Sequence, residues 1–167
     1  MTNYNDPVGV RKKKLAAASA LAIALAVPAE GLRQWAYYDI ADPTLLTVCY
    51  GSTTDVQAGK VYSLGECRAR LDNDMRAAIE TVERCAPGLP EKTLAALGDA
   101  VYNLGPKLVC DPGRSTLARY LRDGRVSDAC EQLPRWSKAR VMGVPVALPG
   151  LTKRRAVERA LCLEGLA

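Results

Sequence analysis

The chain has 167 residues and contains no histidine and no phenylalanine. The absence of histidine excludes Ser-His-Asp and Cys-His catalysis as well as histidine-based metal sites. An enzyme built from this chain would therefore work through carboxylates, hydroxyls or thiols. The composition, 49% hydrophobic and 25% charged, is that of one globular domain with a core built mainly from Leu, Ala and Val.

A strongly apolar run of membrane-spanning length is also missing. The uncharged segment at residues 15–29 has fifteen residues, of which eight are alanine, whereas a stable spanning helix needs about 20 strongly apolar residues. The basic run Arg11–Lys14 precedes it, and a positive flank followed by an apolar stretch is the layout of an export signal. The pattern predicts a basic tail at residues 1–14, a weak signal-anchor at 15–29 and a catalytic domain at 30–167.

Two other interpretations of this N-terminal segment stay open. The small residues of Val27-Pro28-Ala29 offer a site where a signal peptidase could cut, which would make the segment a cleaved signal peptide. Alternatively, the segment is a buried Ala-rich helix of a cytosolic protein.

The positive charge is concentrated at the N-terminus. The formal net charge is +5, and residues 1–29 contribute +3 of it. Residues 30–167 contain 19 basic and 17 acidic residues, a net charge of +2. A nucleic-acid-binding protein needs a basic face on its folded part. The nearly balanced domain therefore argues against nucleic acid as a partner.

The six cysteines form no Cys-x-x-Cys pair. An even number without histidine indicates disulfides in an oxidising compartment more than a metal site, with buried free thiols as the alternative. Six cysteines allow 15 pairings, and the spacing alone does not choose among them.

Beyond the N-terminal segment the sequence predicts an α+β fold that is mainly α, with a small sheet lobe leading into a larger helical lobe. After a helical start at Glu30, a small antiparallel sheet is expected over residues 37–62. Ser63 and Glu66 form a capping box that opens a helix of about twenty residues. The remaining predicted elements are helices from Pro90 to Gly105 and over 115–123, 126–133 and 152–163, with a Gly/Pro-rich loop at 143–150.

The candidate chemical groups are the carboxyls of Glu30, Asp39 and Asp42, which cluster where the first helix is expected to meet the sheet. A carboxyl beside apolar groups keeps its proton more readily and can act as a general acid. A second carboxylate in a wetter position stays ionised and can orient a water molecule. Two carboxyls in different environments are what glycoside hydrolysis requires, although paired acids near a helix end are more often solvated surface.

The stretch EGLRQWAYYDIADPTLLTVCYGST, residues 30–53, resembles the catalytic motif of the phage lysozymes of glycoside hydrolase family 24, endolysins that cut host peptidoglycan. In the family motif a Glu begins the sequence E-G-x-R, an Asp follows after eight intervening residues, and a Thr lies in the hairpin before a Gly-containing strand end. The resemblance assigns the catalytic roles to Glu30, Asp39 and Thr47. A two-residue insertion before Thr47 leaves Asp42 and Thr44 as alternatives.

The resemblance continues to the end of the chain. The segments that carry it are GDAVYNLG (98–105), RSTLARYLRDG (114–124), DACEQLPRW (128–136) and PGLTKRRAVERALC (149–162). It implies a lysozyme-like fold and disulfides pairing Cys49 with Cys67, Cys85 with Cys110 and Cys130 with Cys162. It also implies an arginine, Arg154 or Arg155, that pairs with the catalytic Glu.

The implied activity is that of a lysozyme, an N-acetylmuramidase that hydrolyses the β-1,4 bond between N-acetylmuramic acid and N-acetylglucosamine with no cofactor and no metal. The implied partners are peptidoglycan glycan strands and, before release, the inner membrane through residues 15–29. Similarity to signal-anchor-release endolysins implies a monomer that is tethered inactive at the periplasmic face of the host inner membrane and is then released to the periplasm. The alternatives are a lytic transglycosylase and, from another class, a membrane-tethered module that binds the cell wall without cutting it.

Overall fold

A computed structural model of the chain describes residues 7–38, 44–141 and 144–167. The helices are α1 (Pro7–Ala29), α2 (Leu64–Cys85), α3 (Glu91–Leu104), α4 (Lys107–Cys110), α5 (Thr116–Arg122), α6 (Val126–Gln132), a 3-10 turn η1 (Leu133–Trp136) and α7 (Pro149–Glu164). The strands form two antiparallel hairpins, β1 (Arg33–Tyr38) with β2 (Leu46–Cys49) and β3 (Lys138–Val141) with β4 (Val144–Ala147). The predicted α+β, mainly helical architecture is confirmed.

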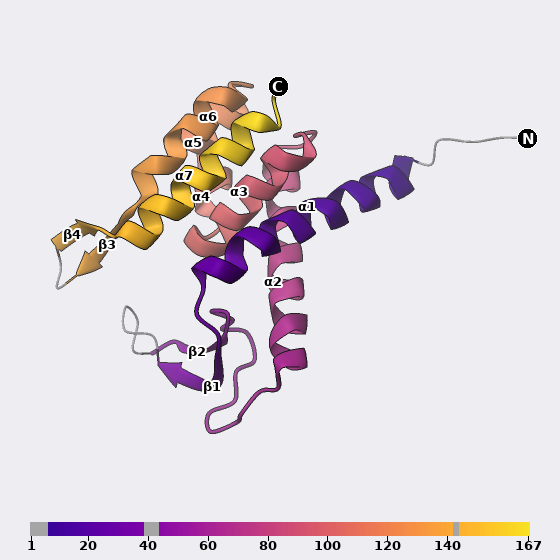
Figure 1. Cartoon of the computed structure of the whole chain (residues 1–167). Coiled ribbons are helices and arrows are strands. Elements are labelled where there is room, and N and C mark those ends of the chain that lie inside the picture. The colour runs from indigo at the N-terminus through magenta and orange to yellow at the C-terminus, as the bar shows by residue number, and fades with distance from the viewer. Residues whose placement is uncertain (1–6, 39–43, 142–143) are drawn as a thin grey trace, which may run out of the picture.

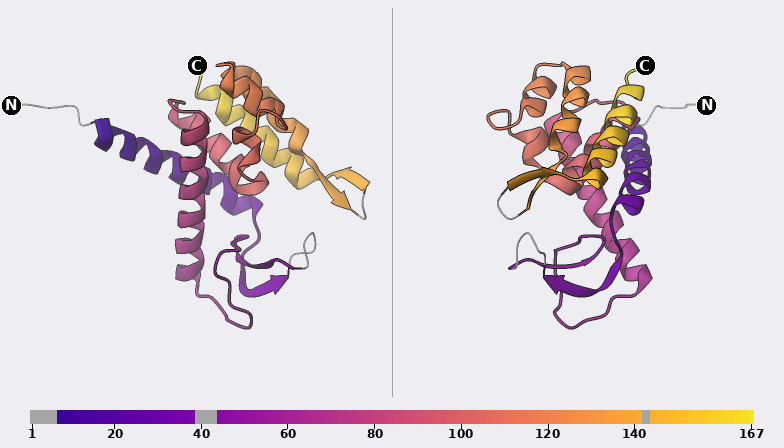
Figure 2. Two further views of the ribbon diagram at one scale, coloured as in Figure 1. Left: turned by 180° about the vertical axis from the view of Figure 1, so that it is seen from behind. Right: turned by 60° about the vertical axis from the view of Figure 1, so that its left-hand side comes forward.

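Two lobes are joined by α2 (Figure 1). The small lobe holds β1, β2 and the loop that follows them, and the large lobe holds the other helices, with the β3–β4 hairpin projecting from its edge. Both further views show the same separation (Figure 2). The main core belongs to the helical lobe, where Met75, Ile79, Leu94 and Leu97 are fully buried between α2 and α3.

Helix α1 packs on the helical lobe through one face. Ala18, Ala22 and Ala26 follow one another at intervals of four residues and have 0% exposure, since residues four apart lie on the same side of a helix. Their small side chains lie against α3, α2 and α7. The N-terminal end of α1 projects beyond the body of the lobe (Figure 1 and the left view of Figure 2).

The basic flank of α1 is fixed at one point. The ammonium group of Lys14 donates to the backbone carbonyl of Leu89 at 3.2 Å and to a carboxyl oxygen of Glu83 at 3.3 Å. Glu83 is 7% exposed, so this contact is shielded from solvent. Among the described residues, no helix is both long enough and apolar enough to cross a membrane.

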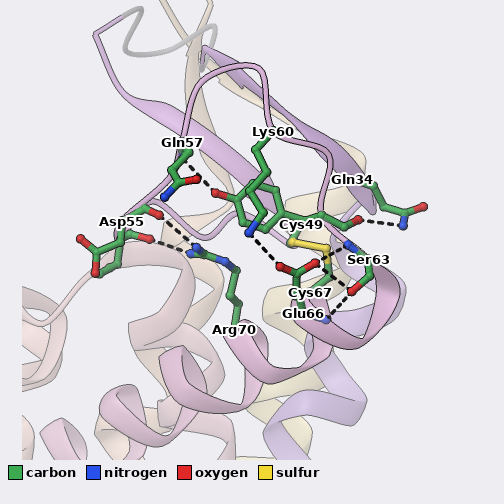
Figure 3. A network of polar contacts seen from close by, with 11 residues as sticks. Gln34, Cys49, Asp55, Gln57, Lys60, Ser63, Glu66, Cys67 and Arg70 are labelled. Carbon is green, nitrogen blue, oxygen red and sulfur yellow. Dashed lines mark hydrogen bonds and ion pairs between the residues drawn. A yellow bond between two sulfur atoms is a disulfide. The ribbon is translucent and has the colours of Figure 1, made fainter.

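A polar network holds the small lobe to the start of α2 through Lys60, Glu66 and Arg70 (Figure 3). The predicted capping box is present, because Ser63 Oγ accepts from the Glu66 amide at 3.2 Å while Glu66 accepts from the Ser63 amide at 2.7 Å. The ion pair with Lys60 and the bonds from Ser63 lower the pKa of Glu66 to about 2. Arg70 binds the carbonyls of Thr54 and Asp55, which fastens the loop after β2 to α2.

Disulfides cross-link both lobes. Cys49–Cys67 joins β2 to α2, while Cys85–Cys110 and Cys130–Cys162 tie α2 to α4 and α6 to α7. These are the three pairs that the family resemblance implied.

Three local expectations were wrong. Residues from Glu30 onward do not begin a helix, because α1 ends at Ala29 and β1 starts at Arg33. Lys60–Tyr62 makes one isolated bridge, between Val61 and Trp35, instead of a full strand. The backbone carbonyl of Tyr62 accepts from the side-chain amide of Gln34 and not from a backbone amide of β1. Part of the expected loop at 143–150 is strand β4, which pairs with β3 because the antiparallel hairpin satisfies its backbone groups.

Candidate active site

Glu30 lies at the junction between α1 and β1. Its backbone amide continues the helix by donating to the Ala26 carbonyl at 2.9 Å, and the chain then turns through Gly31 into the strand. This position places Glu30 at the edge of the helical lobe where the small lobe begins. Its side chain is 24% exposed, so it remains accessible to a ligand.

Arg154 of α7 is the arginine that holds Glu30. Its Nη1 donates to Glu30 Oε1 at 2.5 Å, across 124 positions of the sequence. Burial opposes the charge of Arg154, but its bonds to Asp99 and Glu30 outweigh that effect and raise its pKa. The neighbouring Arg155 points elsewhere, to Asn103 at 3.0 Å and Glu158 at 2.7 Å. The structure therefore chooses Arg154 between the two candidates that the sequence left open.

Asp99 of α3 completes the grip on Arg154. Its two carboxyl oxygens accept from Nε at 3.0 Å and from Nη2 at 2.7 Å, which is the bidentate geometry that suits a guanidinium group. Asp99 has 0% exposure and Arg154 only 7%. Glu158 lies one turn along α7 from Arg154. Burial raises the pKa of Glu158, and the negative charge of Asp99 raises it further.

Tyr102 of α3 connects the site to the small lobe. Its hydroxyl donates to the backbone carbonyl of Tyr50, in the turn after β2. Burial raises the pKa of Tyr102, and the negative charge of Glu30 raises it further, so the phenol stays protonated and acts as a donor. Next to Tyr102, a cavity of about 310 Å³ opens between the loop after β2 and the helices α2 and α3. Gly51, Thr53 and Asp74 line it.

Thr47, the third residue of the predicted site, lies in β2 opposite Tyr37 of β1. It is 2% exposed, and its hydroxyl donates to the Leu45 carbonyl at 3.4 Å. Thr44, its alternative, is an exposed residue in the turn before β2. Asp39 and Asp42 lie outside the described residues.

The polar network behind Glu30 was missed by sequence reasoning. Tyr102 and Asn103 follow Asp99 on α3 by three and four residues, and Glu158 follows Arg154 and Arg155 at helical spacing on α7. Polar residues recurring at this spacing on otherwise apolar helix faces were the available signal. In the part of the chain that the structure describes, no group of three or more His, Cys, Asp or Glu residues could hold a metal ion.

An acidic residue held by a buried arginine at the junction of a small sheet lobe and a larger helical lobe defines the protein as lysozyme-like. The active form of the P1 phage endolysin Lyz has the same fold, with a TM-score of 0.71 and 25% identity over 88% of this chain and 85% of that one. The secreted inactive form of Lyz matches less well, with a TM-score of 0.51 and 24% identity over 68% of this chain and 77% of that one.

The phage lysozyme family matches residues 28–158. A SAR-endolysin of bacteriophage PS119 is 38% identical over 138 residues, which cover 81% of this chain and 77% of that protein. The chain therefore belongs to the phage lysozyme family.

Proposed function

We propose that this protein is an endolysin that hydrolyses the β-1,4 bond between N-acetylmuramic acid and N-acetylglucosamine in peptidoglycan, for lysis of the host cell. Family membership and the endolysin relatives support the coarser activity, that of a peptidoglycan hydrolase acting in cell lysis. The observation that carries the finer proposal is the partly exposed Glu30 carboxyl, held by Arg154 between the two lobes.

In this proposal Glu30 is the general acid. It donates a proton to the glycosidic oxygen as the bond to the muramic acid carbon breaks, so the leaving sugar departs as a neutral alcohol. A water molecule attacks the opposite face of the sugar ring with inversion of configuration. Asp39 and Thr47 position that water, and the Asp39 carboxylate takes up the proton that the water loses. The donated bond from Thr47 to Leu45 leaves the Thr47 oxygen available as a hydrogen-bond acceptor.

Product analysis tests the reaction class. Purified peptidoglycan digested in ¹⁸O-labelled water should yield fragments with new reducing ends on N-acetylmuramic acid, each carrying one ¹⁸O, because hydrolysis adds water at that carbon. Borohydride reduction followed by mass spectrometry locates and counts these ends. Unlabelled 1,6-anhydro products would show a lytic transglycosylase instead, and new reducing ends on N-acetylglucosamine would show that the other glycosidic bond is cut.

The proposal extends to the N-terminal segment. We infer that residues 1–14 stay on the cytoplasmic side and that 15–29 anchor the chain weakly in the host inner membrane until release to the periplasm, where it acts as a monomer. Ala29 directly precedes Glu30, so an anchored segment would hold the catalytic acid at the lipid surface, away from Arg154. The packed α1 corresponds to the released form, and the greater likeness to the active than to the inactive form of Lyz supports this.

The released, active protein should therefore retain its N-terminal segment. Ala18, Ala22 and Ala26 complete the buried face of the helical lobe, and removing them would expose the apolar surface that they cover. Intact-mass measurement and N-terminal sequencing of the active periplasmic fraction should show a chain that includes residues 7–29, equal in length to the membrane-bound fraction. An active form that begins at or near Glu30 would instead establish a cleaved signal peptide.

A further inference from the structure

Arg154 donates hydrogen bonds to two carboxyl groups, which share it unequally. Asp99 takes two of its N–H groups in a fork, at 3.0 and 2.7 Å, and Glu30 takes a third from Nη1. A guanidinium group is planar, so a fork on one edge fixes the direction of the remaining N–H groups. The two bonds from Arg154 to Asp99 therefore orient the guanidinium group so that its Nη1 is directed toward Glu30.

Burial makes the Asp99 fork the rigid part of this arrangement. Asp99 is fully buried and the Arg154 side chain is 5% exposed, while Glu30 is 24% exposed. A buried ion pair that keeps all its partners is held firmly, because separating the charges inside the protein is costly. Glu30, at the accessible end, is the partner of Arg154 that a substrate can reach.

Among the residues that the structure describes, the charged and titratable groups that act on Glu30 lie on two helices. Tyr102 of α3 and both Arg154 and Arg155 of α7 interact with it, and Asp99 of α3 shares Arg154 with it. Glu158 lies closer to Arg155, at 2.7 Å, than to Arg154, at 3.4 Å. Glu158 thus lies nearer to Arg155, and its raised pKa favours the uncharged acid, so Asp99 is the carboxylate that compensates Arg154.

The negative charge of Asp99 affects whether Glu30 can act as the general acid of the proposed function. An uncompensated cation beside a carboxyl favours the ionised form, which has no proton to donate. With Asp99 in place, Glu30 can take up a proton without leaving Arg154 as an unpaired buried charge. We propose that Asp99 is a positioning residue, which orients Arg154 and keeps the Glu30 carboxyl able to hold the catalytic proton; the inference rests on Glu30 being the general acid.

The test is the pH profile of the Asp99→Asn variant. Asparagine is nearly the same size and keeps one acceptor, but it removes the charge, so Glu30 becomes the main counter-ion of Arg154 and loses its proton at lower pH. The alkaline limb of kcat/KM against pH on purified peptidoglycan should move toward acid by about one pH unit. If the asparagine variant does not fold, Asp99→Ser removes the same charge with less volume and should move the limb in the same direction.

Glu83→Gln is the matched control, since it neutralises another largely buried, ion-paired carboxyl far from Glu30. The alkaline limb of its kcat/KM profile should lie at the wild-type pH. A folded Asp99 variant whose alkaline limb stays at the wild-type pH or moves toward alkali overturns the inference. Glu30→Gln measured in parallel separates the two proposals. If Glu30→Gln digests the wall, the proposed function fails; if it is inactive and the limb of Asp99→Asn does not move, only the role of Asp99 fails.

Discussion

Replacing Glu30 by glutamine should lower the rate of peptidoglycan digestion by about a thousandfold, the largest effect expected of any single substitution in this chain. Glutamine preserves the shape of the side chain and can accept the bond from Arg154, but it has no proton to give to the glycosidic oxygen. The measurement is the initial rate of release of new reducing ends from purified walls by the released, full-length protein.

The fold should survive this substitution. The Glu30 side chain is 24% exposed, and Arg154 keeps both hydrogen bonds to Asp99 when glutamine replaces Glu30, so the free energy of unfolding should fall by about 1 to 3 kcal/mol. Glu131→Gln is a suitable control, because Glu131 is also paired with an arginine, at 2.6 Å, but on the exposed outer side of α6 and α7. That variant should digest walls at the wild-type rate. Appreciable digestion by a folded Glu30→Gln variant would rule out Glu30 as the acid.

Replacing Ala22 by leucine should both destabilise the released protein and lower its activity. Ala22 has 0% exposure, and three additional carbon atoms there would force α1 away from the helices on which it packs, at a cost of about 1 to 3 kcal/mol. Glu30 directly follows α1, so a displaced helix carries the carboxyl away from Arg154. Activity should fall about tenfold or more, as a loss of about 1.4 kcal/mol in the transition state implies. Urea unfolding and wall digestion measure the two effects.

Ala20→Leu is the matched control for this experiment. Ala20 is in the same segment but on the exposed face of α1, so the substitution gives the segment the same composition and apolar character without a steric clash. It should leave the stability and activity of the released protein near wild type. Equal losses in the two variants would show that the packing of α1 does not position Glu30, and that the apolar character of the segment is the decisive property.

The features that were predicted correctly are those that depend on neighbours in the sequence. Ser63 and Glu66 cap α2 because a capping box needs only residues three positions apart. The helical lobe followed from apolar spacing, and the motif from Glu30 to Thr53 was sufficient to indicate the family. The prediction of a helix from Glu30 was wrong because the signals for a helix and for a strand compete after Ala29. The pairing of β1 with β2 and the contact of Gln34 with Tyr62 favour the strand.

The choice between Arg154 and Arg155 needed the folded chain. Both follow the same motif and differ by about 100° around α7, and only the packing of α7 on α3 shows which side faces Glu30. Asp99 was missed for a similar reason. The role of a single acidic residue in an apolar helix cannot be inferred until its partner, here Arg154, 55 positions away in the sequence, is known.

The sequence by itself determined the class of chemistry, since a chain without histidine was restricted to carboxylates, hydroxyls and thiols. It also determined the longer helices of the large lobe, the candidate acid and a weakly apolar N-terminal segment. The tertiary structure decided how these parts meet: that an alanine stripe of α1 completes the helical lobe, and that Asp99, Arg154 and Glu30 form one connected group. The physical reason is that helix periods and caps are local properties of the chain. Burial and charge compensation, in contrast, arise between residues that only folding brings together.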